Sequence, residues 1–230
     1  MIDVNRHKFM LVQILKDVYS DFDLASSLGF KGGTALMFFF DLPRFSVDLD
    51  FNLLVDEKAD LVYSRMRKIL LKYGTIHDEA KKFYGPLLVL DYGFGERKLK
   101  VEISNRNFND RYSVMNFLGI NVRVMVPEDM FAHKLCALLD RNTLTPRDIF
   151  DCWFFAQKRT SLNGKIIESL MGMPLSDYLQ TCIDQIEVFS DKKLLDGLGE
   201  LMNPDMKKFV RTKMRTELVQ LLNTYKAFPI

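Results

Sequence analysis

The segment KGGTALMFFFDLPRFSVDLDF, Lys31–Phe51, joins two adjacent glycines to a short apolar run and then to two aspartates separated by one leucine. Asp48 and Asp50 repel each other at this spacing, and burying them costs free energy unless a positive charge lies close by. These two carboxylates therefore require a cation nearby.

The first half of the segment predicts a turn followed by a short buried helix. Gly32 and Gly33 precede the apolar run 34–40, and the helix ends at Leu42 because Pro43 disfavours helical geometry in the residue before it. Free amides at the start of such a helix, together with the helix dipole, favour a bound phosphate group. A turn that needs a positive φ angle explains the glycine pair equally well.

The second half predicts a strand over residues 46–54. Side chains two residues apart lie on the same face of a strand, so Asp48 and Asp50 project together, with Ser46 and Arg44 on the same side. Carboxylates that converge in this way are typical ligands of Mg²⁺ or Mn²⁺, and two such ions can assist phosphoryl transfer. The alternative interpretation is the polar outer face of an edge strand.

A third carboxylate, Glu102, lies on a later predicted strand over residues 99–104. It would complete a set of three acids if its strand runs beside the strand that carries the aspartates. A solvated glutamate that pairs with Lys100 or Arg97 is the alternative.

The remaining pattern predicts an α+β fold in which helices dominate the second half of the chain. We expect an αβ domain over residues 1–126 and a helical domain over residues 127–230 that completes a cleft. The expected helices cover residues 6–20, 57–72, 127–140, 146–158, 164–171, 175–189 and 205–226. A hairpin is expected over residues 86–104, and further strands between residues 117 and 126.

Composition places the chain among ordinary globular proteins, with 48% hydrophobic and 27% charged residues. Its three scattered cysteines form no CxxC pair, which argues against a disulfide scaffold or a zinc site. The amphipathic start of the chain does not have the character of a signal peptide, and no apolar run approaches the ~20 residues that span a bilayer. These features predict a cytoplasmic protein with no membrane contact.

Taken together, GGTAL and RFSVDLDF resemble the AbiEii/AbiGii-type toxin family within the DNA polymerase β-like nucleotidyltransferase superfamily. The superfamily pattern is a Gly-Gly or Gly-Ser turn on a helix, a DxD strand, and a third acidic residue on a later strand. Gly32-Gly33, Asp48, Asp50 and Glu102 match these elements in order. A glutamate stands here where the superfamily more commonly has an aspartate.

The AbiEii-like branch is similar further along the chain, where a helical lysine precedes an RDxxD sequence. Lys134 in MFAHKLCALLDR and Arg147, Asp148 and Asp151 in RDIFD are the matching residues. Without the resemblance, Lys134 lies in an apolar stripe, where it must snorkel or meet an anion. Asp148 is explained equally by the helix cap that Thr145 and a following proline predict.

The resemblance implies a nucleotidyltransferase-like fold for the αβ domain over residues 1–126, and it implies roles for these residues. It implies catalytic roles for Asp48, Asp50, Glu102, Lys134 and Asp148, with the first three as metal ligands. The residues expected to bind the nucleotide are Gly32, Gly33, Thr34, Arg44, Ser46, Lys134 and Arg147.

The activity that the resemblance implies is Mg²⁺- or Mn²⁺-dependent transfer of a nucleoside monophosphate from a nucleoside triphosphate. The acceptor would be an RNA, such as a tRNA, or a protein, and the partner of such a bacterial toxin would be a neutralising antitoxin. Two alternatives are transfer of the γ-phosphoryl group on the same scaffold, as in a kinase, and a nucleotide- or RNA-binding module without turnover.

Overall fold

The computed structural model describes residues 3–106, 108–140 and 143–228. It divides into two compact units. Unit 1 comprises Met1–Asp41 and Phe45–Met125, and unit 2 comprises Leu42–Arg44 and Val126–Ile230. Unit 1 carries a seven-stranded mixed sheet with helices and unit 2 is helical, so the predicted α+β class is confirmed.

The sheet of unit 1 runs in the order β3-β4-β5-β2-β1-β7-β6. Two strand pairs, β2 with β5 and β1 with β7, are parallel, and the other neighbours are antiparallel. The strands are β1 (Leu28–Lys31), β2 (Leu49–Leu53), β3 (Thr75–Lys82), β4 (Gly85–Asp91), β5 (Leu99–Ser104), β6 (Tyr112–Phe117) and β7 (Ile120–Met125).

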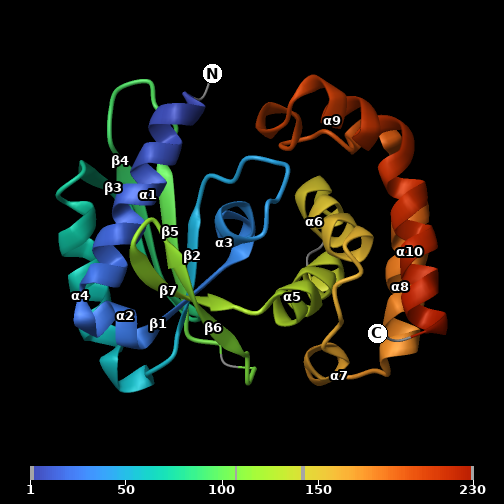
Figure 1. Cartoon of the computed structure of the whole chain (residues 1–230), viewed down its shortest axis with the longest axis horizontal. Helices are drawn as coiled ribbons and strands as arrows, with labels where there is room; N and C mark the ends of the chain where they lie inside the picture. The colour runs from blue at the N-terminus through green and yellow to red at the C-terminus, as the bar shows by residue number, and fades with distance from the viewer. Residues whose placement is uncertain (1–2, 107, 141–142, 229–230) are drawn as a thin grey trace. The chain divides into compact units, whose positions relative to one another are not determined.

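Alternation along the central strands divides the sheet into an apolar face and a polar face. Leu49, Phe51, Val101 and Ile103 are buried and point away from the neighbouring Asp50 and Glu102. In Figure 1, α1 (Val4–Ser20), α2 (Phe22–Ser27) and α4 (Ala59–Leu70, after the 3₁₀ turn Asp56–Lys58) lie on one side of the sheet, and α3 (Gly32–Phe39) lies on the other. The packing of this apolar face therefore positions Asp50 and Glu102 on the opposite, polar face of the sheet.

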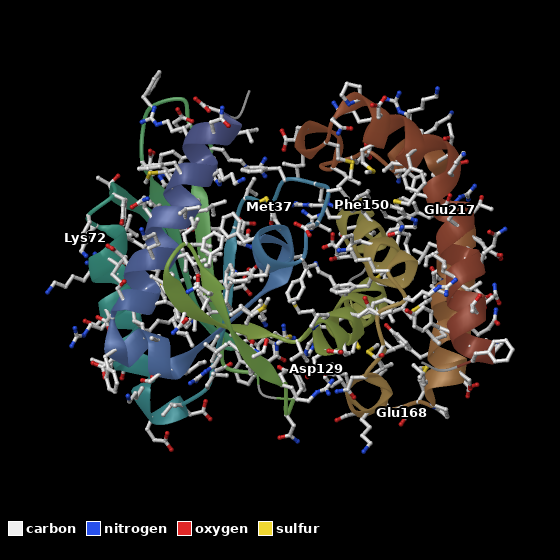
Figure 2. The ribbon with its side chains drawn as sticks, in the orientation of Figure 1. Met37, Lys72, Asp129, Phe150, Glu168 and Glu217 are labelled. Carbon is white, nitrogen blue, oxygen red and sulfur yellow. The ribbon has the colours of Figure 1, made fainter. Side chains whose placement is uncertain are left out.

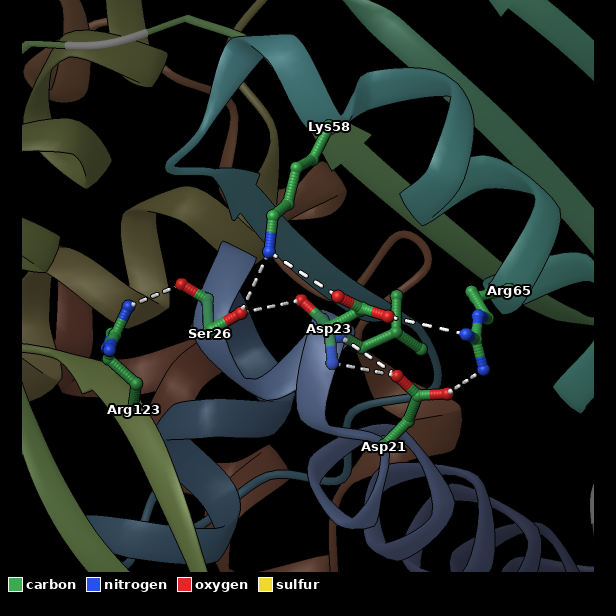
Figure 3. Close-up of polar contacts among 7 residues, drawn as sticks. Asp21, Asp23, Ser26, Lys58, Arg65 and Arg123 are labelled. Carbon is green, nitrogen blue, oxygen red and sulfur yellow. Dashed lines mark hydrogen bonds and ion pairs between the residues drawn. The ribbon is translucent and has the colours of Figure 1, made fainter.

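A polar cluster fastens α2 to its neighbours within unit 1 (Figure 3). Arg65 of α4 contacts the carboxylates of Asp21 and Asp23 at 3.2 and 3.3 Å. Ser26 accepts a hydrogen bond at its carbonyl oxygen from Arg123 of β7, and its hydroxyl group lies 3.4 Å from Lys58 Nζ. The short helix is thus held at the start of β1, the strand that leads into the glycine pair.

Unit 2 contains helices α5 (Pro127–Asp140), α6 (Pro146–Gln157), α7 (Gly164–Met171), α8 (Leu175–Glu187), α9 (Pro204–Phe209) and α10 (Arg215–Ala227). Two 3₁₀ turns, Asp191–Lys193 and Gly199–Leu201, lie between α8 and α9, and a π-helical turn over Val210–Met214 joins α9 to α10. Trp153 of α6 donates a hydrogen bond to Glu217 of α10 at 3.1 Å; Figure 2 labels Glu217 and, on α6, Phe150.

Most predicted elements are present, but the strand that carries the aspartates begins later than expected. It starts at Leu49 instead of residue 46, so strict alternation does not extend back to Arg44. Arg44 belongs to unit 2, so the strand does not carry it. Strands β1 and β3 and helix α2 were not expected from the sequence, and β6 begins at Tyr112, before the range 117–126 in which further strands were expected.

No helix among the described residues is long and apolar enough to span a membrane.

Candidate active site

A row of three charged side chains crosses the centre of the sheet. Lys31 at the end of β1 pairs in register with Asp50 of β2, and Asp50 pairs in register with Glu102 of β5. Residues paired in this way lie on the same face, with neighbouring strands about 4.8 Å apart. The predicted proximity of Asp50 and Glu102 is therefore present, and Lys31 is an additional cation that the sequence pattern did not single out.

Asp48 lies one residue before β2, where it contacts Lys100 of β5. The Lys100 ammonium is 3.9 Å from Asp48 Oδ2 and 3.5 Å from Glu102 Oε2. One cation is thus within reach of both carboxylates. The structure places Asp48, Asp50 and Glu102 as close neighbours.

Gly32 lies directly against Asp50. A Cβ atom at position 32 would approach Asp50 Oδ2 to 2.5 Å, and the backbone of Gly32 has a φ of +79°. Two separate effects therefore disfavour a side chain at position 32: a steric clash with the Asp50 carboxylate, and a backbone conformation that favours glycine. This contact joins the glycine pair to the aspartate pair, which the sequence showed only as neighbouring motifs.

The start of α3 is also fixed to the aspartate segment by Thr34. Its hydroxyl group donates a hydrogen bond to the carbonyl oxygen of Asp48. Ser46 is buried, and its backbone N–H points to the sulfur of Met37 at 3.4 Å (Met37 is labelled in Figure 2). Gly33 is buried in the first turn of α3. The predicted nucleotide-binding residues 32, 33 and 34 therefore form the start of α3 in unit 1, and Ser46 contacts the same helix nearer its end.

The environment of Asp50 disfavours its charged form. Burial is the main cause that raises the pKa of Asp50, and the negative charge of Asp48 raises it further. The positive charges of Lys100 and Lys31 act in the opposite direction. Burial likewise lowers the pKa of Lys31, against the attraction of Asp50. The Asp50 carboxylate forms no side-chain hydrogen bond or ion pair with any described residue. The two cations nearby therefore compensate its charge only from a distance.

The acidic set is chemically suited to a divalent cation. Mg²⁺ and Mn²⁺ prefer carboxylate oxygens, and Lys100 shows that oxygens of Asp48 and Glu102 already share one cation. Within residues 3–106, 108–140 and 143–228, however, no three His, Cys, Asp or Glu side chains are grouped as a ready metal centre. The residues fit such an ion by the chemistry of their oxygen atoms.

A polar cluster that the sequence did not indicate continues along the same face of β2. The side-chain amide of Asn52 donates hydrogen bonds to Asp110 at 2.9 Å and to the Tyr112 hydroxyl at 2.7 Å. Gly29 makes room for Tyr112, because a Cβ atom there would come within 2.2 Å of the ring. The cluster fixes the segment before β6 over the polar face of the sheet.

In unit 2, Arg44 takes part in a buried ion network. Arg44 binds both oxygens of Asp151, through Nε at 2.7 Å and through a terminal nitrogen at 2.6 Å. Lys134 of α5 contacts the same carboxylate at 2.8 Å and Asp148 at 3.1 Å. The anions that Lys134 meets within unit 2 are therefore carboxylates of α6.

The electrostatics of this network favour its charged state. Burial alone would raise the pKa of Asp151, but Arg44 and Lys134 together hold it below its usual value. Burial opposes the charge of Lys134, yet Asp151 and Asp148 raise its pKa. Asp151 was noted in the sequence only as part of RDIFD, although its spacing from Asp148 places both acids on one face of α6.

Asp148 also serves the cap that the sequence suggested. The Thr145 hydroxyl accepts a hydrogen bond from the Asp148 backbone N–H at 3.4 Å and donates one to its carboxylate at 2.6 Å. Arg147 lines a cavity of about 600 Å³ together with Gln185 and Lys193. The structure therefore brings Lys134 and Asp148 together, and Arg147 takes part in neither ion pair of Lys134.

A family model described as "Nucleotidyl transferase AbiEii toxin, Type IV TA system" matches residues 13–224. The chain belongs to this family. It is therefore a nucleotidyltransferase, as the sequence motifs predicted. A comparison with curated proteins finds no match.

Solved structures with the same fold support the family assignment at the level of architecture. MenT4, a nucleotidyltransferase toxin from Mycobacterium tuberculosis, is 17% identical with a TM-score of 0.66, over 98% of this chain and 88% of that one. A putative nucleotidyltransferase from Helicobacter pylori is 20% identical with a TM-score of 0.56, over 96% of each chain. JHP933 from Helicobacter pylori is 21% identical with a TM-score of 0.53, over 97% and 95%.

The contact between Gly32 and Asp50 makes a prediction for this AbiEii-family chain. Gly32→Ala should abolish nucleotidyl transfer and lower the free energy of unfolding by about 1–3 kcal/mol, because the methyl group displaces the Asp50 carboxylate and strains the backbone. Gly95→Ala is the matched control, since Gly95 has a φ of +77° with open space around it. It should be destabilised by about 1 kcal/mol and keep full activity. Equal activity losses in the two variants would contradict the special role of Gly32.

The ion network of unit 2 predicts an unequal cost for two similar substitutions. Asp151→Asn should lower the free energy of unfolding by about 3–5 kcal/mol, because it leaves Arg44 and Lys134 buried without their shared anion. Asp191→Asn removes the exposed partner of Arg215, 3.0 Å away, and should cost under about 1 kcal/mol. Urea denaturation of both variants measures the difference. A cost below about 1 kcal/mol for Asp151→Asn would show that the network does not hold unit 2 together.

Proposed function

We propose that the chain transfers a nucleoside monophosphate from a nucleoside triphosphate to a hydroxyl group of an RNA, such as a tRNA, or of a protein. The observation that carries this proposal is the convergence of Asp48, Asp50 and Glu102 beside a helix start whose first residue, Gly32, touches Asp50. Acidic groups and phosphate-binding amides are the two components that nucleotidyl transfer requires. Family membership supports the same chemistry.

The first turn of α3 is the proposed phosphate-binding element. Backbone N–H groups at the start of a helix lack intrahelical partners and favour an anion. Gly32 and Gly33 leave the backbone open for close approach, and Thr34 fixes that backbone to the aspartate segment. Ser46, buried near Met37, is proposed as a further polar contact of the nucleotide.

Asp48, Asp50 and Glu102 are the proposed ligands of Mg²⁺ or Mn²⁺. Such an ion, when bound, stabilises the negative charge that develops on the phosphoryl oxygens. In the proposed reaction, the acceptor oxygen forms a bond to the α-phosphorus and the bond from that phosphorus to the bridging oxygen breaks. Pyrophosphate leaves with the bonding electrons, and a carboxylate oxygen of Asp48 or Glu102 takes the proton of the acceptor.

The roles of the unit 2 residues are proposed on the family resemblance. Lys134 and Arg147 are proposed to bind the nucleotide, with Asp148 as a catalytic acid and Arg44 as a further contact. In unit 2 itself, Arg44, Lys134 and Asp148 take part in the network around Asp151. That network would preorganise the lysine and prevent the carboxylates from repelling an incoming phosphate.

The biological role that we propose is the toxin of a bacterial toxin–antitoxin or abortive-infection system, acting in the cytoplasm. The description of the matching family names such a toxin. Transfer of a nucleotide to an essential RNA or protein would stop growth, and a partner antitoxin would relieve it.

Product analysis with labelled nucleotides tests this function. The purified protein, each α- or γ-labelled triphosphate, Mg²⁺ or Mn²⁺, and total RNA or cell lysate should give a macromolecule labelled only from the α position. Asp48→Asn and Asp50→Asn should each reduce incorporation by at least about 100-fold, because each removes a group that stabilises the transition state. Asp60→Asn, at a carboxylate that is 94% exposed, is the control and should keep full incorporation.

Two outcomes would contradict the proposal. Incorporation only from the γ position would show kinase-type transfer on the same scaffold. Equal incorporation and equal growth inhibition by the parent and the Asp48 and Asp50 variants would show that the acidic set is not catalytic.

A further inference from the structure

Lys100 holds a position that none of the roles above explains. It lies on β5, two residues before Glu102, and its side chain is 38% exposed. Its ammonium group nevertheless turns to the two acids instead of extending into water, at 3.5 Å from Glu102 and 3.9 Å from Asp48. A single monovalent cation thus contacts two of the three proposed metal ligands.

Strand pairing explains why the lysine reaches both carboxylates. The parallel register joins Leu49 to Val101 and Asp50 to Glu102, so the residue before β2, Asp48, falls beside Lys100. Side chains at this point lie on the polar face of the sheet. The chain therefore carries its own cation at the place where the acids converge.

We propose that Lys100 is a stand-in cation, which stabilises Asp48 and Glu102 in the metal-free protein and must leave them when a divalent ion binds. The inference rests on the proposed metal-dependent function. It adds a positioning residue and a competition between lysine and metal to that site.

The strength of the contacts suits such an exchange. The side chains of Asp48 and Glu102 are 27% and 45% exposed, and ion pairs of this exposure are weak and easily replaced. A divalent ion offers twice the charge and direct coordination, so it can displace the ammonium group. Lys100 differs in this respect from Arg44 in unit 2, whose bidentate pair with Asp151 is almost fully buried.

Competition makes a measurable prediction for metal affinity in the absence of nucleotide. Lys100→Met keeps the length of the side chain and removes its charge, so Mn²⁺ should bind about three- to tenfold more tightly than to the parent. Lys100→Arg keeps the charge and should bind Mn²⁺ as the parent does. The loss of the free Mn²⁺ signal in electron paramagnetic resonance measures the dissociation constant directly.

Lys98→Met is the matched control for net charge. Lys98 lies two residues before Lys100, is exposed, and forms no side-chain ion pair with any described residue. Its substitution should change the affinity by less than about twofold, since the charges of exposed groups are largely screened by salt. An equal gain in both methionine variants would show a general charge effect and overturn the inference.

Thermal melting provides a second readout that does not depend on activity. Without metal, Lys100→Met should melt below the parent, because Asp48 and Glu102 lose their nearest cation. With saturating Mn²⁺ the variant should gain more stability than the parent, as tighter binding to the native state requires. Melting above the parent in the absence of metal would argue against a stabilising role.

The remaining outcomes distinguish a failure of the proposed role of Lys100 from a failure of the proposed metal-dependent function. Equal Mn²⁺ affinity in the parent and Lys100→Met would overturn the stand-in role and leave the metal site intact. Absence of Mn²⁺ binding in every protein, including the parent, would overturn the metal site and the stand-in role together.

Discussion

The constraint on which unit 1 depends is the compensation of negative charge at the centre of its sheet. Asp48, Asp50 and Glu102 lie together on one face and repel one another. Lys100 offsets this repulsion by contacting Asp48 and Glu102, and Lys31 lies on the strand beside Asp50. The apolar face of the same strands, with Phe51 and Val101 buried, fixes the acids in place. A site that gathers like charges costs stability, which is the usual consequence of organising groups for catalysis.

The periodicity of apolar residues was enough to predict the helices and strands that have a clear apolar pattern. It did not predict elements whose formation depends on pairing with a neighbouring strand. The helices of unit 2 and the hairpin of β4 and β5 follow from their sequences. Strand β3 was not predicted because its sequence, TIHDEAKK, is mostly polar, as an exposed edge strand can be, and only pairing with β4 defines it. The late start of β2 at Leu49 has a similar origin, since the preceding residues lack strand partners among the described residues.

For the site, sequence motifs identified the acids but not what surrounds them. The DxD spacing and the glycine pair were visible, whereas the contact of Gly32 with Asp50 arises only when β1 and β2 pair. Lys100 was weighed only as a solvated partner of Glu102, and its additional contact with Asp48 required the parallel register. Arg44 lies close to the aspartates in the sequence, which suggested that it projects from the same strand face. In the structure its guanidinium group binds Asp151 within unit 2, a contact that the sequence spacing did not indicate.

The most direct test of the account is the melting temperature of Asp50→Asn without divalent ions, measured against pH. Because burial and Asp48 raise the pKa of Asp50, ionisation of this group destabilises the native state as pH rises from the ordinary aspartate range through the raised pKa. The account predicts that the variant melts above the parent at neutral pH, that this advantage disappears in acid, and that the variant transfers no nucleotide. A variant that melts below the parent at neutral pH would show that Asp50 is a structural residue and contradict the account.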